Sequence, residues 1–128
     1  MNSLFKIGIT GHQLLPPKHL EDITESIGEF YNEVHKKHKD IVVLSSLAEG
    51  ADMLCASIAL EMGFQLVAPL PFDELEYSKN YYGDDIYEFD WLCKAAEEVF
   101  TVIPFEEVPD DPQRGFYYRQ AGIYVAKN

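Results

Sequence analysis

Apolar residues fall into four short continuous runs, separated by longer segments in which they recur every three or four positions. The runs cover residues 4–10, 41–47, 64–70 and 99–103 and are rich in Ile, Val, Leu and Phe. Runs of this length and composition are typical of buried strands. Gly11 stops the first run and Pro104 closes the last. The pattern therefore predicts four strands.

The segment between the first two runs predicts a long amphipathic helix. Pro16 and Pro17 suit its first turn, and helical spacing continues to about His38. Its apolar face would comprise Leu20, Ile23, Ile27, Phe30, Tyr31 and Val34.

Three further segments have helical character. One runs from Gly50 to Gly63, a glycine placed where helices end in the left-handed conformation. An acid followed by Glu three positions later predicts a short helix capped by Asp73 and a longer one from Asp85 to about Glu97. The last helix is expected over residues 116–125.

The resulting β-α-β-α-β-α-β-α order predicts a Rossmann-like α/β fold. Its doubly wound, mainly parallel sheet would carry helices on both faces, in three α/β/α layers. Residues 1–128 are expected to form one domain. Four strands make a small sheet for this class, so we expect either that the natural domain continues beyond Asn128 or that one or more C-terminal strands have been cut away.

The net charge of the chain limits the classes of molecule that it is expected to bind. The chain has 22 acidic and 10 basic residues, a net charge of −12. Such a chain repels polyanions, so neither DNA nor RNA is expected to bind. A phosphate-bearing ligand would have to be held mainly by backbone N–H groups and a helix amino terminus, because few cationic side chains are available.

Cysteine usage and hydropathy point to the cytoplasm. Cys55 and Cys93 lie in helical segments with apolar neighbours, which suits reduced thiols better than a disulfide framework. No run approaches the roughly 20 apolar residues of a membrane span, so no membrane partner is expected.

The loops after the first two strands are the first place to look for a site, because ligands of doubly wound folds bind at the carboxyl ends of the strands. Thr10, Gly11 and His12 follow the first strand. They could bring a hydroxyl, a closely approaching backbone and a ring N–H to an anion. A tight turn with a capping hydroxyl is the alternative.

The second loop resembles an anion cradle. Ser45 and Ser46 are small donors at the strand end, and Gly50 and Ala51 open the next helix, whose dipole attracts phosphate. Glu49 and Asp52 are ambiguous. Each is an ordinary acid in a first helical turn, or else a group that accepts from ribose hydroxyls or orients a water.

Other motifs are absent or ambiguous. The sequence lacks G-x-G-x-x-G, the P-loop motif and any metal-ligand spacing, so no cofactor and no metal are predicted. Arg119 could bind a phosphate, or could form a surface ion pair. The aromatic residues of segment 77–91 could stack on a base, form a subunit contact or belong to the core.

Three motifs carry a family resemblance that extends from Lys6 to about Ala126. Residues 8–12 (GITGH) are similar to the motif V-T-G-x-R. Residues 47–52 (LAEGAD), with Ala56 and Ala59, are similar to G-G-A-x-G-A-D-x-x-A-x-x-x-A. Residues 118–121 (YRQA) are similar to an arginine-bearing helix. These motifs resemble the SLOG superfamily, which joins the Smf proteins, the Lonely Guy phosphoribohydrolases and related nucleotide sensors.

The sequence also departs from that family. His12 or Gln13 stands where the family commonly has arginine, and Ser45-Ser46 stands near its first glycine pair. Nothing matches the P-G-G-x-G-T-x-x-E of the Lonely Guy enzymes, so the resemblance assigns no catalytic residue.

These observations leave three functional hypotheses. The first is binding or sensing of a nucleotide or nucleotide-derived phosphate ligand. Its site residues would be Thr10, Gly11, His12, Ser45, Ser46, Glu49, Gly50, Ala51, Asp52 and Arg119. The second is hydrolysis of a nucleotide N-glycosidic bond with Glu49 or Asp52 assisting. The third is an interaction domain, and a homo-oligomer is left open as a partner.

Overall fold

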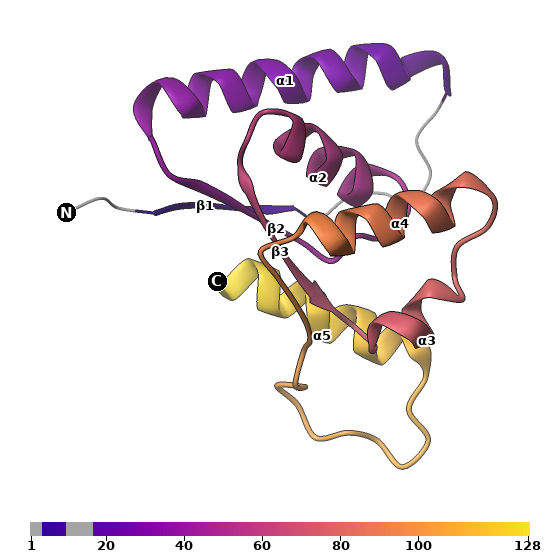
Figure 1. Ribbon diagram of the computed structural model, residues 1–128. Helices are drawn as coiled ribbons and strands as arrows, with labels where there is room; N and C mark the ends of the chain where they lie inside the picture. The colour runs from indigo at the N-terminus through magenta and orange to yellow at the C-terminus, as the bar shows by residue number, and fades with distance from the viewer. Residues whose placement is uncertain (1–3, 10–16) are drawn as a thin grey trace.

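The computed structural model describes residues 4–9 and 17–128. This part of the chain forms a four-stranded sheet and five α-helices (Figure 1). In chain order the elements are β1 (Phe5–Ile9), a 3₁₀ turn (Pro17–His19), α1 (Leu20–Lys37), β2 (Ile41–Ser45), α2 (Ala51–Glu61), β3 (Gln65–Leu70), α3 (Glu74–Ser78), α4 (Asp84–Ala95), β4 (Glu98–Thr101) and α5 (Arg114–Lys127).

All four strands are parallel, and they lie in the sheet in chain order, β1-β2-β3-β4. Crossover connections between parallel strands are right-handed. When each crossover leads to the next strand in the same direction across the sheet, all the crossover helices lie on one face. Helices α1, α2 and α4 accordingly lie on one face, and α5 crosses to the other, where it contacts β1 and β3 (Figure 1). The predicted three-layer α/β fold is confirmed. The strand order therefore contains no point at which it reverses direction within the sheet. The chain passes to the other face of the sheet only after β4, where it forms α5.

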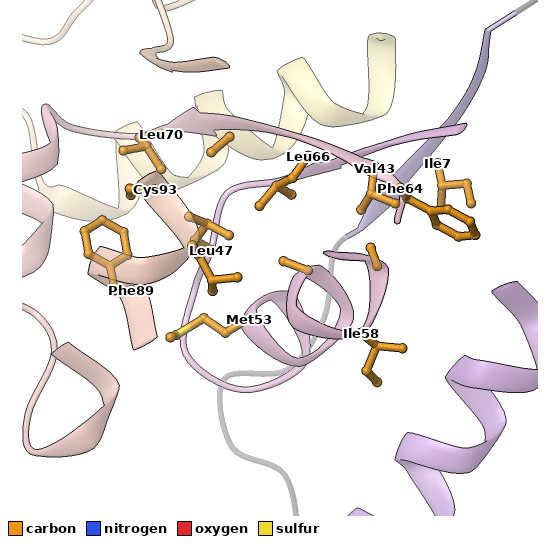
Figure 2. Packing of buried hydrophobic residues seen from close by; sticks show 14 of the residues in the cluster. Ile7, Val43, Leu47, Met53, Ile58, Phe64, Leu66, Leu70, Phe89 and Cys93 are labelled. Carbon is orange, nitrogen blue, oxygen red and sulfur yellow. The ribbon is translucent and has the colours of Figure 1, made fainter. Parts of the chain in front are cut away.

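The two faces of the sheet bury two sets of side chains, because neighbouring strand residues point in opposite directions. Val43 and Leu66 point from the sheet towards α2 (Figure 2). Val42 and Leu44 pack on the other face against Val125 of α5. Helix α2 lies between the sheet and α1 and also contacts α4, which explains why its sequence is apolar on almost every side.

Two predicted helix ends are confirmed in detail. Gly63 has a φ of +83°, and the N–H of Phe64 donates to the carbonyl of Ala59 at 3.0 Å, the 6→1 bond of a Schellman motif. At the start of α3, the carboxylate of Asp73 accepts from the N–H of Glu76 at 2.9 Å. Both ends therefore follow from local chemistry.

Three expectations were wrong. Helix α4 begins at Asp84 with Gly83 as its N-cap, because Gly83 has a φ of +57° that suits glycine, so Asp85 is a first-turn acid. Leu20 and Phe30 are exposed, since the buried face of α1 is centred on Tyr31. Strands β2 and β4 end at Ser45 and Thr101, each two residues before the predicted end.

Helix α5 approaches β1 closely at Gly8. A Cβ on Gly8 would lie 2.9 Å from Cγ1 of Val125 and 3.1 Å from its carbonyl oxygen. Such distances are shorter than normal packing allows, so the absence of a side chain at Gly8 sets how near α5 lies to the sheet.

We predict that Gly8→Ala lowers the free energy of unfolding by about 1–3 kcal/mol, because the added methyl group pushes α5 away from β1. The matched control is Gly122→Ala in α5, where a Cβ would meet no atom within 4 Å. That change should stabilise by about 0.5–1 kcal/mol, since alanine restricts the unfolded chain. Urea unfolding measures both, and equal effects would contradict the close approach.

Candidate functional site

The connection from β2 to α2 contains a left-handed residue. Leu47 has a φ of +58°, although its side chain is fully buried. The Ser45 hydroxyl lies inside this turn, where it accepts from the N–H of Leu47 at 3.1 Å and donates to the carbonyl of Asp52 at 3.0 Å. Ser45 is itself fully buried, so its hydroxyl ties the strand end to the first turn of α2.

A tyrosine holds the same turn from the other side. The hydroxyl of Tyr81, between α3 and α4, donates to the carbonyl of Leu47. A left-handed residue other than glycine costs about 1–2 kcal/mol, so it persists only where its surroundings fix it. Ser45 and Tyr81 supply that restraint for Leu47.

We expect Tyr81→Phe to lower the free energy of unfolding by about 1–2 kcal/mol, because the buried Leu47 carbonyl loses its hydrogen-bond donor. Tyr87→Phe in α4 is the control, since the Tyr87 ring is exposed. The two variants can be compared by thermal and urea unfolding. A Tyr81→Phe protein as stable as the control would show that the bond contributes nothing.

Helix α2 begins at a position that only glycine fits well. Gly50, its N-cap, has φ +96° and ψ −125° and provides no side chain to cap the helix. The N–H groups of a first helical turn have no carbonyl within the helix to bond, and the helix dipole makes this end attractive to anions. Gly50 and Ala51 therefore form the kind of helix start that the sequence predicted.

A polar cavity of about 230 Å³ lies beside this helix start. It is lined by Ala48, Glu49, Tyr77, Asn80, Tyr81 and Tyr118. The Asn80 side-chain amide donates to the Tyr118 hydroxyl, which joins α5 to the end of α3. The cavity therefore collects groups from the β2–α2 loop, the α3–α4 region and α5.

The aromatic side chains beneath the cavity form a packed cluster. Tyr81 stacks on Phe89, with ring centroids 4.6 Å apart, and Tyr77 meets Phe89 edge-on at 5.5 Å. Burial is the main cause that raises the pKa of both Tyr77 and Tyr81, so both stay protonated. The buried Tyr77 hydroxyl makes no hydrogen bond of ordinary geometry with the described residues, although it lies near the Tyr81 hydroxyl.

The two arginines differ in their relation to the cavity. Arg119 is exposed and pairs with Glu106 at 3.0 Å, which is the surface ion pair of the alternative interpretation. Arg114 instead donates to the side-chain Oδ1 of Asn80 at 3.0 Å and to the carboxylate of Glu76 at 3.2 Å. Neither arginine lines the cavity, but Arg114 contacts a lining residue, Asn80, whereas Arg119 pairs with Glu106.

A pair of carboxyl groups lies at the cavity. Glu49 shares a hydrogen bond with Asp85, and this contact, followed by desolvation and charge repulsion, raises the pKa of Glu49. Burial, followed by repulsion from Asp85, also raises the pKa of Glu88. Negative charge is therefore concentrated where α4 begins, next to Glu49.

The Glu49 pair predicts a pH-dependent stability. A raised folded-state pKa means that stability falls as pH rises through it, because the folded protein holds the proton more tightly. Glu49→Gln removes this loss, so its Tm should match the unaltered protein below about pH 4 and exceed it increasingly towards pH 7.

Asp85→Asn provides the partner variant. The double variant should gain less than the sum of the two single gains, because both substitutions relieve one repulsion. Thermal unfolding from pH 4 to pH 7 measures all four proteins. Parallel Tm curves for Glu49→Gln and the unaltered protein would contradict the coupling.

The predicted site residues occupy different positions. Ser46 is half-buried, and its hydroxyl has no hydrogen-bond partner within residues 4–9 and 17–128. Asp52 is buried in the first turn of α2, and its charge adds to the burial that mainly raises the pKa of Cys55 and Tyr77. Thr10, Gly11 and His12 lie outside the described residues.

Sequence reasoning missed most of the cavity wall. Asn80 and Tyr118 were not proposed, and Asp85 was assigned to a helix cap. The aromatic richness of residues 77–91 was the available signal, but nothing in the sequence tells which tyrosines face the cavity.

The described residues contain no group of three or more His, Cys, Asp or Glu side chains arranged to hold a metal ion. Among the same residues, no helix combines the length and the apolar character that crossing a membrane requires.

No protein-family model matches the chain, and no match was found among functionally characterised proteins. The fold and cavity define a three-layer α/β domain with a polar pocket at the carboxyl end of β2. The resemblance to the SLOG superfamily stays a prediction that rests on short motifs.

Proposed function

We propose that the protein binds or senses a nucleotide or nucleotide-derived phosphate ligand at the carboxyl ends of β1 and β2. The observation that carries this proposal is the start of α2, which opens on Gly50 without a side-chain cap and lies beside the polar cavity. The N–H of Met53 in this first turn donates to the carbonyl of Ala48 at 3.2 Å, so a phosphate would meet the N–H groups that precede it. Backbone N–H groups at such a helix start suit a phosphate, which a protein with a net charge of −12 can otherwise meet with few cations.

The cavity lining supports a ligand with hydroxyl groups as well. Glu49 can accept hydrogen bonds from a ribose, and the tyrosines present ring surface and hydroxyls. At about 230 Å³ the cavity is smaller than typical pockets for whole drug-sized ligands, so it suits the sugar and phosphate end of a nucleotide.

We also place the protein in the cytoplasm as part of this proposal. Cys55 and Cys93 are free thiols, and burial is the main cause that raises the pKa of Cys55 to about 11 and that of Cys93 further. Thiols with raised pKa values are unreactive, which suits a structural role in a reducing compartment.

The test is a thermal-shift screen followed by calorimetry with AMP, ADP, adenosine, ribose 5-phosphate and inorganic phosphate. A ligand at a hundred times its Kd should stabilise the protein by about 2.7 kcal/mol. We expect phosphate-bearing sugars to bind and adenosine to bind less tightly. No shift with any compound would overturn the proposal.

Two arginine variants locate the site. Arg114→Gln should weaken ligand binding about tenfold, because a charge-assisted contact near Asn80 is lost. Arg119→Gln is the matched control on the same helix and should leave the affinity unchanged, since Arg119 pairs with Glu106 on the surface. If Arg119→Gln weakened binding more than Arg114→Gln, the ligand would bind away from the cavity.

The carboxyl pair favours a second candidate, hydrolysis of a nucleotide N-glycosidic bond. A carboxyl group whose pKa is raised can hold a proton for a leaving base, while a neighbouring carboxylate directs water to the sugar carbon. Water would then add its hydroxyl to that carbon and give its other proton to the neighbouring carboxylate, while the carbon–nitrogen bond breaks and the base leaves with the proton of the first carboxyl group. Glu49, at the cavity, fits the first role, with Asp85 beside it.

Chromatography for free base after incubation with nucleoside monophosphates tests this second candidate. Base should be released by the unaltered protein and not by Glu49→Gln. If the ligand binds and no base appears, binding alone remains as the function.

A further inference from the structure

A second hollow lies on the outer surface between α3 and α4 and shares no lining residue with the cavity of the candidate site. Its volume is about 350 Å³. The α3–α4 groove, as we call it, is lined by Glu74, Leu75, Ile86, Tyr87 and Asp90, together with Ser78 and Phe89.

Large apolar side chains are exposed at this groove. Leu75 and Tyr87 are each 76% exposed, and Trp91 and Ile86 are 49% and 41% exposed. Tyr87 and Trp91 are four residues apart and therefore adjoin on α4, and Tyr87 lines the groove together with Ile86. The buried residues of α4 are Leu92, Cys93 and Phe89, of which Phe89 also lines the groove. A contiguous exposed apolar patch of this kind marks an interaction surface.

The edges of the α3–α4 groove are acidic. The segment ELEYS of α3 has two acidic residues, and DDIYEFDWLCKA of α4 has four against one lysine. That lysine, Lys94, already pairs with Asp90 at 2.9 Å. Of these acids, Glu74 and Asp90 line the groove, whereas Glu76 pairs with Lys79 and Arg114. The apolar strip of the groove is therefore bordered by two carboxylates and one paired lysine.

Charge complementarity selects the occupant. A second copy placed symmetrically would bring Glu74 and Asp90 against the same acidic edges, which repel. An amphipathic helix with one apolar face and flanking Lys or Arg side chains matches both the strip and its edges. We propose that the α3–α4 groove docks a basic amphipathic helix of a partner protein.

The probe is a synthetic Leu/Lys amphipathic helix of about 18 residues, five turns long. Its control is a peptide of the same composition, scrambled so that no apolar face forms. Trp91, the single tryptophan, reports the contact through its fluorescence, and calorimetry gives the affinity. The amphipathic peptide should shift the emission of Trp91 and bind at least about tenfold more tightly than the scrambled one.

Variants test the two properties of the groove separately. The double variant Leu75→Ser/Tyr87→Ser should weaken binding about tenfold or more. Val108→Ser, which alters an exposed apolar residue remote in sequence from α3 and α4, should not. Glu74→Gln with Asp90→Asn should weaken binding and reduce its dependence on salt. Far-UV circular dichroism checks that each variant is folded.

Three outcomes would overturn the proposal. The scrambled peptide could bind as tightly, which would mean charge attraction alone. Val108→Ser could weaken binding as much as the groove variant. Light scattering could show a dimer that Leu75→Ser/Tyr87→Ser abolishes, which would make a second copy the occupant of the groove.

Discussion

The left-handed turn at Leu47 determines the arrangement of the carboxyl end of the sheet. The turn places the Leu47 side chain in the core and its carbonyl under the Tyr81 hydroxyl. The Ser45 hydroxyl bridges Leu47 and the first turn of α2, so the direction in which α2 leaves the sheet depends on these bonds. A conformation that costs about 1–2 kcal/mol in isolation is offset by two hydrogen bonds and a buried side chain.

The same turn links the two faces of the domain. Tyr81 belongs to the aromatic cluster under α4, and that cluster continues to Tyr118 of α5, on the opposite side of the sheet. Helix α5 is fixed at both ends, by Tyr118 against Asn80 and by Val125 against Gly8. The cavity therefore lies where the helices of both faces meet, and its shape depends on packing from every layer.

The fold was predictable because it depends on repeating patterns and local chemistry. Strand runs, helical spacing and the caps at Gly63 and Asp73 are properties of short segments. The site was predictable only in part. Gly50 follows from the loop sequence, but the choice of Arg114 over Arg119 depends on which side of α5 faces Asn80. Leu47 in a left-handed conformation violates residue preference, and it depends on the local bond to Ser45 together with the long-range bond from Tyr81.

The distribution of charge around the cavity constrains what can enter it. The hydrogen bond with Asp85, followed by desolvation and repulsion from the same carboxylate, raises the pKa of Glu49, so a ligand with several unscreened phosphates would add negative charge to an acidic pair. The start of α2 at Gly50, next to Glu49 in the chain, has a positive electrostatic potential because of the helix dipole. A ligand with one anionic end and a hydroxyl-rich end satisfies both, because its anion meets the start of α2 while its hydroxyls donate to the carboxylates. This polarity favours a sugar monophosphate unit over a polyphosphate chain.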